Sequence, residues 1–158
     1  MCVLKIFSES TSFRTYAATT ALPVYSTHEA DEIRRRSTGE TFGVYRISFD
    51  VSEEDWDNFP GQVHDAIDFL TLYSSAIKSL IDSHPVSEAF LDFPLWSRLE
   101  GNVVNQNDRL SPELLALCAQ AGIGIEMSLY DRAAFQALGD RPSQDAMPNT
   151  SFERTREG

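Results

Sequence analysis

The stretch GQVHDAIDFLTLYSSAIKSLIDSHP, residues 61–85, decides the fold because it carries the clearest helical pattern of the chain. Apolar side chains recur every three or four positions, while aspartates, serines and a lysine occupy the positions between them. His84 and Pro85 end the pattern, because the residue before a proline disfavours helical backbone angles. The apolar stripe consists of Val63, Ala66, Ile67, Leu70, Tyr73, Ile77, Leu80 and Ile81. We predict an amphipathic helix that packs on a core through this stripe.

A second helix is predicted by SPELLALCAQAG, residues 111–122. Ser111 is a favourable N-cap, Pro112 suits the first helical position, and Glu113 adds a negative charge to the first turn. Gly122 is a natural residue just past the end of a helix, where the backbone often turns left-handed. The segment therefore has both a start and a stop signal.

The segments around these helices alternate between apolar and polar residues, which predicts strands with two different faces. The clearest strand is FGVYRISFDV, residues 42–51, and further strands are predicted at 2–7, 88–93 and 123–131, with a short one at 23–29. An antiparallel sheet commonly has one packed face and one solvated face. We therefore predict an α+β fold of two layers, in which a mostly antiparallel sheet carries two main helices on one face.

The length and composition suit a single globular domain. The apolar pattern fades after residue 131, so we expect a single α+β domain over residues 1–131 and a partly disordered C-terminal extension over 132–158. No apolar run approaches the length of a membrane span, and the start resembles a strand more than a signal peptide, so we expect a cytoplasmic protein without a membrane partner.

The formal net charge of −11 argues against nucleic-acid binding, since a phosphate backbone calls for a basic surface. The excess lies entirely in residues 1–131, which hold 9 basic and 20 acidic residues. Such a charge favours encounter with a basic partner. The alternative is that the charge only keeps the protein soluble.

The densest acidic run is DVSEEDWDNF, residues 50–59, with five acids in eight residues around a tryptophan. Aromatic residues amid charge are frequent anchors of protein interfaces. We therefore take as a candidate binding site Glu53, Glu54, Asp55, Trp56 and Asp57. The alternative is that Trp56 packs on the core and the acids cap one helical turn that begins after Ser52.

A second candidate site lies on the polar face of the predicted sheet. Alternation along the strand places Leu91 and Phe93 on one face of the sheet and Asp92 on the other, which also receives Arg46 and Glu126. The structural interpretation is a solvated carboxylate that pairs across strands with Arg46 or Lys5. The functional alternative is a ligand-binding or acid–base site formed by Arg46, Asp92 and Glu126.

The sequence contains no complete catalytic or metal-binding signature, which favours a protein that is not an enzyme and needs no cofactor or metal. His64 and Asp68 are four residues apart on a helix and predict a solvated pair. Cys2 and Cys118 belong to no motif, so we expect two buried free thiols, while their spacing also allows a disulfide.

Residues 88–131 combine LDFPLWSRLEG with LSPELLALCAQAGIGIEMSLYD, that is, a strand ending in LDF, a loop, a capped helix and a closing strand. This arrangement resembles small uncharacterised bacterial domains, some of which are similar to immunity proteins of polymorphic toxin systems. The resemblance implies a two-layer α+β fold and a non-enzymatic binding role, and it supplies no catalytic residues.

Two functions are therefore expected from the sequence. The first is a non-enzymatic protein-binding module, of the immunity-inhibitor type, that covers a basic partner with its acidic surface. The alternative is a small-molecule-binding or hydrolytic domain that uses the polar sheet face.

Overall fold

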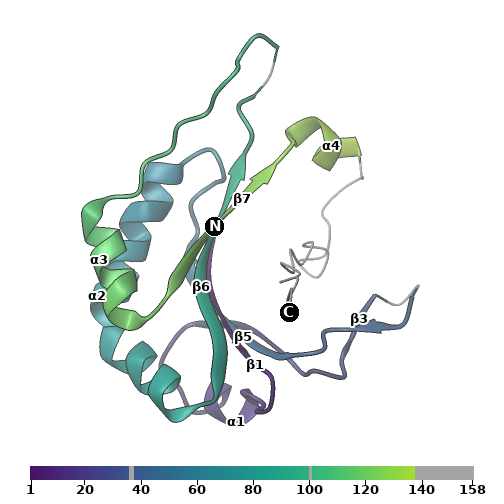
Figure 1. Cartoon of the computed structure of the whole chain (residues 1–158), viewed down its shortest axis with the longest axis vertical. Coiled ribbons are helices and arrows are strands. Elements are labelled where there is room, and N and C mark those ends of the chain that lie inside the picture. The colour runs from purple at the N-terminus through teal and green to yellow at the C-terminus, as the bar shows by residue number, and fades with distance from the viewer. Residues whose placement is uncertain (36–37, 100, 138–158) are drawn as a thin grey trace, which may run out of the picture.

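A five-stranded sheet with helices packed on one of its faces forms the body of the molecule (Figure 1). The computed structural model describes residues 1–35, 38–99 and 101–137. Across the sheet the strands are β2 (Val24–His28), β5 (Tyr45–Ser52), β1 (Cys2–Ser8), β6 (Val86–Trp96) and β7 (Gly124–Tyr130). The two main helices are α2 (Phe59–Ser83) and α3 (Pro112–Ala121). Only the β6–β7 pair of this sheet is parallel, so the predicted α+β class and its mostly antiparallel sheet are confirmed.

Smaller elements lie around this body. They are the short helix α1 (Arg14–Ala17), the two-stranded ribbon of β3 (Ile33–Arg35) and β4 (Glu40–Thr41), and the helix α4 (Arg132–Ala137). Gly39 adopts a φ of 68° in the β3–β4 turn, which suits a residue without a Cβ atom. The predicted strand at 23–29 corresponds to β2.

The core lies between the sheet and the two helices. Strand alternation directs one set of side chains toward the helices, and the register places Leu4 between Phe49 and Leu91. The large fully buried side chains of the sheet are Leu4, Ile6, Ile47, Phe49, Leu91, Phe93 and Leu95. Helix α2 contributes Val63, Ala66, Leu70, Ile77 and Leu80 from the predicted stripe. Leu91 and Phe93 therefore lie on the helix-packed face, as the alternation predicted.

Helix α3 provides the crossover that a parallel pair of strands requires between β6 and β7. The Ser111 side chain accepts a hydrogen bond of 3.1 Å from the backbone N–H of Leu114, and Gly122 has a φ of 69°. The predicted start and stop signals of this helix are both confirmed.

The predicted helical turn after Ser52 is wrong. Ser52 is the last residue of β5, and its hydroxyl donates to Asp65 at 2.6 Å and accepts from the N–H of Glu54 at 3.1 Å. Residues 53–58 form an irregular connection, and the cap of α2 is Asn58, whose side chain accepts from the N–H of Gly61 at 3.1 Å. Pro60 then stands in the first turn, where its missing N–H costs nothing.

Strand β6 continues past the predicted end at residue 93 and passes through Pro94 to Trp96. A proline is unfavourable inside a sheet because it cannot donate to the ladder. The pairing of β1 with β6 stops at Val3 and Asp92, so Pro94 lies beyond the N-terminal end of the paired part of β1. The strand can therefore include a proline at this point.

Among the helices of the described residues, none is long and apolar enough to cross a membrane. Cys2 and Cys118 are both buried and free, in agreement with the predicted thiols, and burial raises the pKa of the Cys118 thiol to about 11. The extension over 132–158, which we predicted to be partly disordered, begins with a described helix, α4, at Arg132–Ala137. The rest of that prediction concerns residues outside the described part of the chain.

Candidate functional site

The connection between β5 and α2, residues 53–58, takes the place of β1 beside the last residues of β6. The Nε2 of Gln62, a fully buried side chain of α2, donates to the carbonyl of Pro94 and to that of Asp55, each at 3.1 Å. The backbone N–H of Trp96 donates to the carbonyl of Trp56 at 3.4 Å. The backbone of the acidic run is therefore fixed where the β1 ladder ends.

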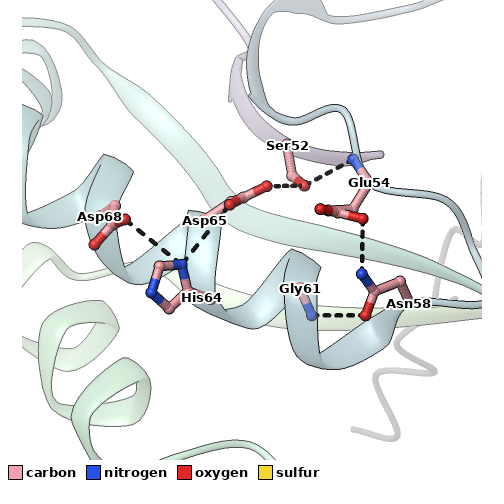
Figure 2. Close-up of polar contacts among 7 residues, drawn as sticks. All are labelled: Ser52, Glu54, Asn58, Gly61, His64, Asp65 and Asp68. Carbon is pink, nitrogen blue, oxygen red and sulfur yellow. Dashed lines mark hydrogen bonds and ion pairs between the residues drawn. The ribbon is translucent and has the colours of Figure 1, made fainter.

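Two of the acidic side chains near this connection are used in local contacts at the start of α2 (Figure 2). Glu54 accepts a hydrogen bond of 2.7 Å from the Nδ2 of Asn58, and Asp65 accepts from Ser52. His64 lies 3.6 Å from a carboxylate oxygen of Asp68, and both side chains are exposed, which confirms the predicted solvated pair. These residues shape the connection.

Trp56 lies in an aromatic cluster at the end of the sheet. Its ring centroid is 4.6 Å from that of Trp96 and 4.7 Å from that of Tyr130, where β6 and β7 end side by side. Phe135 of α4 meets these rings edge-on, at 5.5 Å from Trp56 and 5.2 Å from Trp96. All four residues keep part of their surface exposed. Trp56 is therefore not buried beneath the main helices, unlike its neighbour Phe59, which joins the core.

Among the described residues, three carboxylates border this cluster, one in an ion pair and two exposed without an ion pair. The Nη2 atom of Arg132 donates to both carboxylate oxygens of Asp57, at 2.7 and 2.6 Å. Glu53 and Asp55 are exposed, and within the described residues neither carboxylate forms an ion pair. We call Glu53, Asp55, Asp57, Trp56, Trp96 and Tyr130 the acidic aromatic surface. Of the five residues proposed from the sequence, Glu54 and Asp57 use their carboxylates in contacts within the chain, with Asn58 and Arg132 respectively.

The second predicted site is partly assembled. Asp92 and Glu126 are direct partners in the β6–β7 register, and both lie on the face opposite the main helices. Arg46 shares that face, but it is opposite Phe7 in the register, four residues along β1 from Val3, the partner of Asp92. Its guanidinium lies over Phe42, with the Cζ atom 5.2 Å from the ring centroid. Arg46 therefore does not join Asp92.

Lys5 is the cation that reaches Asp92. Its Nζ is 2.5 Å from Asp92 Oδ2, and the hydroxyl of Ser128 donates to Asp92 Oδ1 at 2.7 Å. The side chain of Asp92 is only 2% exposed and that of Lys5 is 16% exposed. The predicted pairing with Lys5 is confirmed, but the expectation of a solvated carboxylate is wrong. We call Lys5, Asp92, Glu126 and Ser128 the polar centre of the sheet.

The polar centre has an unusual electrostatic balance. Burial raises the pKa of Glu126, and the negative charge of Asp92 beside it raises this pKa further, while Lys5 opposes both effects. Burial likewise raises the pKa of Tyr130, which borders both sites. Two carboxylates facing one ammonium group can in principle bind a small cation or exchange a proton.

Sequence reasoning missed Trp96, Tyr130 and Phe135 as members of the aromatic cluster. Alternation placed Tyr130 on the polar face, but the predicted end of the strand at residue 93 left Trp96 in a loop. Extending the same alternation from Asp92 through Pro94 places Trp96 on that face. Nothing in the sequence signals that Trp56 packs against both rings, since this contact joins residues far apart in the chain.

Comparison with protein-family models, with curated proteins and with solved structures finds no match to this chain. Function is therefore inferred from the residues of the two sites themselves.

Proposed function

We propose that this protein is a non-enzymatic binding module that holds a basic protein partner on its acidic aromatic surface. The single observation that carries the proposal is the position of Trp56. This residue stacks on Tyr130 and contacts Trp96 at a tilted angle, remains partly exposed, and is bordered by the exposed carboxylates of Glu53 and Asp55.

The two kinds of residue have separate roles in such an interface. Exposed carboxylates attract a basic surface over a distance of about a Debye length and raise the association rate. A tryptophan that loses its remaining water contacts on binding supplies the larger share of the lasting affinity. Because the supporting rings and Gln62 already hold Trp56 in place, little conformational entropy is lost when a partner covers it. An inhibitor of the immunity type would act in this way, by covering a basic partner.

Capture from a lysate of the native host tests the proposal. The tagged full chain should retain a basic protein at low salt and release it at high salt. The variant Trp56→Ala and the double variant Glu53→Lys/Asp55→Lys should each lose it. Lys78→Ala, which changes an exposed charge on α2, is the matched control and should retain it. Capture that does not depend on Trp56 or on these two acids would refute the proposal.

A second candidate function follows from the polar centre of the sheet. The observation that favours it is the burial of Asp92 between Lys5 and Ser128, next to a carboxyl group whose pKa is raised. Such a group of charges suits a small cationic ligand or a hydrolytic reaction. A ligand of this site should raise the melting temperature of the wild-type chain and not that of Glu126→Gln. Equal shifts in the two chains would exclude it.

A further inference from the structure

Helix α4 places an arginine and a phenylalanine of this chain on the acidic aromatic surface. The Cζ atom of Arg132 lies 5.0 Å from the ring centroid of Trp96, while its Nη2 contacts both carboxylate oxygens of Asp57. Phe135, three residues later, meets Trp56 and Trp96 edge-on. The surface is therefore already occupied by a cation and a ring that come from the chain itself.

The geometry around Arg132 is suited to a guanidinium group in particular. A guanidinium is planar, so it can lie over an aromatic ring while its N–H groups point to a carboxylate in the same plane. A lysine ammonium is a compact, strongly hydrated charge and cannot satisfy both contacts in this way. We therefore expect the pair of Asp57 and Trp96 to favour arginine over lysine, because only a guanidinium can place its Cζ over the ring while one of its nitrogens contacts the carboxylate.

We propose that Asp57 and Trp96 form a guanidinium-binding site in which Arg132 and Phe135 are a self-ligand that an arginine of a basic partner replaces. This inference rests on the proposed function, because it names the group by which the partner is recognised. The partner would present an arginine to Asp57 and Trp96, and an apolar side chain about one helical turn away would take the place of Phe135.

The self-ligand is held weakly enough to be replaced. The side chains of Arg132 and Asp57 are 43% and 65% exposed, and solvent weakens such exposed pairs so that they contribute little. Helix α4 has six residues, which is too short for a helix that is stable without packing. The segment occupies the site because it is attached to the end of β7, which keeps its local concentration high. A separate arginine must compete only with these few contacts.

The test uses the full-length chain with its self-ligand removed. The variant Arg132→Ala/Phe135→Ala should fold as the wild type does, because both residues lie on the surface of the aromatic cluster. The probe is the capped peptide DRAAFQA, the sequence of residues 131–137, with matched peptides in which lysine or alanine replaces the arginine. Chemical shifts of the Trp56 and Trp96 indole N–H groups report binding.

The emptied chain should bind the arginine peptide about three- to tenfold more tightly than the lysine peptide, and the alanine peptide least. Adding Asp57→Asn to the emptied chain should remove the preference for arginine. The wild-type chain should show smaller shifts, because Arg132 competes. Equal binding of the arginine and lysine peptides, or shifts that do not depend on Asp57, would overturn the inference. If the double variant does not fold, Arg132→Ala alone is titrated, with the same expected order of peptides.

The outcomes separate this inference from the proposed function. If the chain prefers the arginine peptide but captures no basic protein, the guanidinium site is supported and the proposed function is refuted. A chain that captures a basic protein through Trp56 with no preference for arginine peptides keeps the function and loses the site.

Discussion

The polar centre and the acidic aromatic surface lie on neighbouring parts of one sheet and use their charges in opposite ways. In the polar centre, Asp92 is almost fully buried and bound on both oxygens. At the end of the sheet, Glu53 and Asp55 are exposed to solvent, and the aromatic rings beside them are only partly covered. A buried charge contributes to stability through its partner, whereas an exposed one contributes little to stability and remains available for binding. We therefore expect the first region to matter for stability and, under the proposed function, the second for recognition.

The largest effect on stability is expected for Asp92→Ala. Removing this carboxylate takes from Lys5, which is 16% exposed, the group that its ammonium contacts directly and leaves it with Glu126 nearby. We expect a loss of about 3 kcal/mol in the free energy of unfolding. Urea denaturation measures this loss. The double variant Lys5→Met/Asp92→Leu should recover much of it, because it removes both charges together. A loss below about 1 kcal/mol would mean that the pair behaves like an exposed one, and the contrast between the two regions would disappear.

Gln62→Ala should have the next largest effect. The substitution removes two hydrogen bonds from a fully buried amide and leaves the carbonyl of Pro94 unpaired, which should cost about 2 kcal/mol. It should also loosen residues 53–58, so amide hydrogen exchange there should become faster than in the core of α2. Unchanged exchange over this connection would show that Gln62 does not fix the acidic run.

The stability of Glu126→Gln relative to wild type should depend on pH. The folded-state pKa of Glu126 is raised above its ordinary value of 4.5, so the folded chain takes up this proton at a higher pH than the unfolded chain. The contribution of Glu126 to stability is therefore most favourable below about pH 4.5 and is lost as pH rises through the raised pKa. Relative to wild type, Glu126→Gln should be neutral or stabilising at pH 7, and this relative advantage should shrink on acidification. An advantage that grows on acidification would show that this pKa is lowered instead.

The smallest effect on stability is expected for Glu53→Lys/Asp55→Lys. Neither carboxylate forms an ion pair within the described residues, so the free energy of unfolding should change by no more than about 0.5 kcal/mol. Thermal denaturation checks this value. A loss of several kcal/mol would give these acids a structural role and remove the distinction from Asp92.

The sequence predicted the parts of this molecule that depend on local patterns. The 3.6-residue period and the capping residues predict the helices at 61–83 and 111–121. The two-residue period predicts the alternation in β5 and β7 and places Asp92 on the other face of the sheet from Leu91 and Phe93. The burial of Asp92 could not be predicted, because it depends on Lys5 and Ser128, which are brought together by strand order. The end of β6 was missed because Pro94 is acceptable only where β1 has stopped pairing. The packing of Trp56 against Trp96 and Tyr130 likewise depends on contacts that no short segment encodes.

The most direct test of the account is the affinity of the captured basic partner for Trp56→Ala, measured by calorimetry beside Glu126→Gln. The account predicts that Trp56→Ala weakens binding by about 2 kcal/mol or more and that the chain remains folded, since this ring lies at the end of the sheet outside the main core. Glu126→Gln should leave the affinity unchanged. If instead Glu126→Gln weakens binding and Trp56→Ala does not, recognition belongs to the polar centre, and the division between the two regions is contradicted.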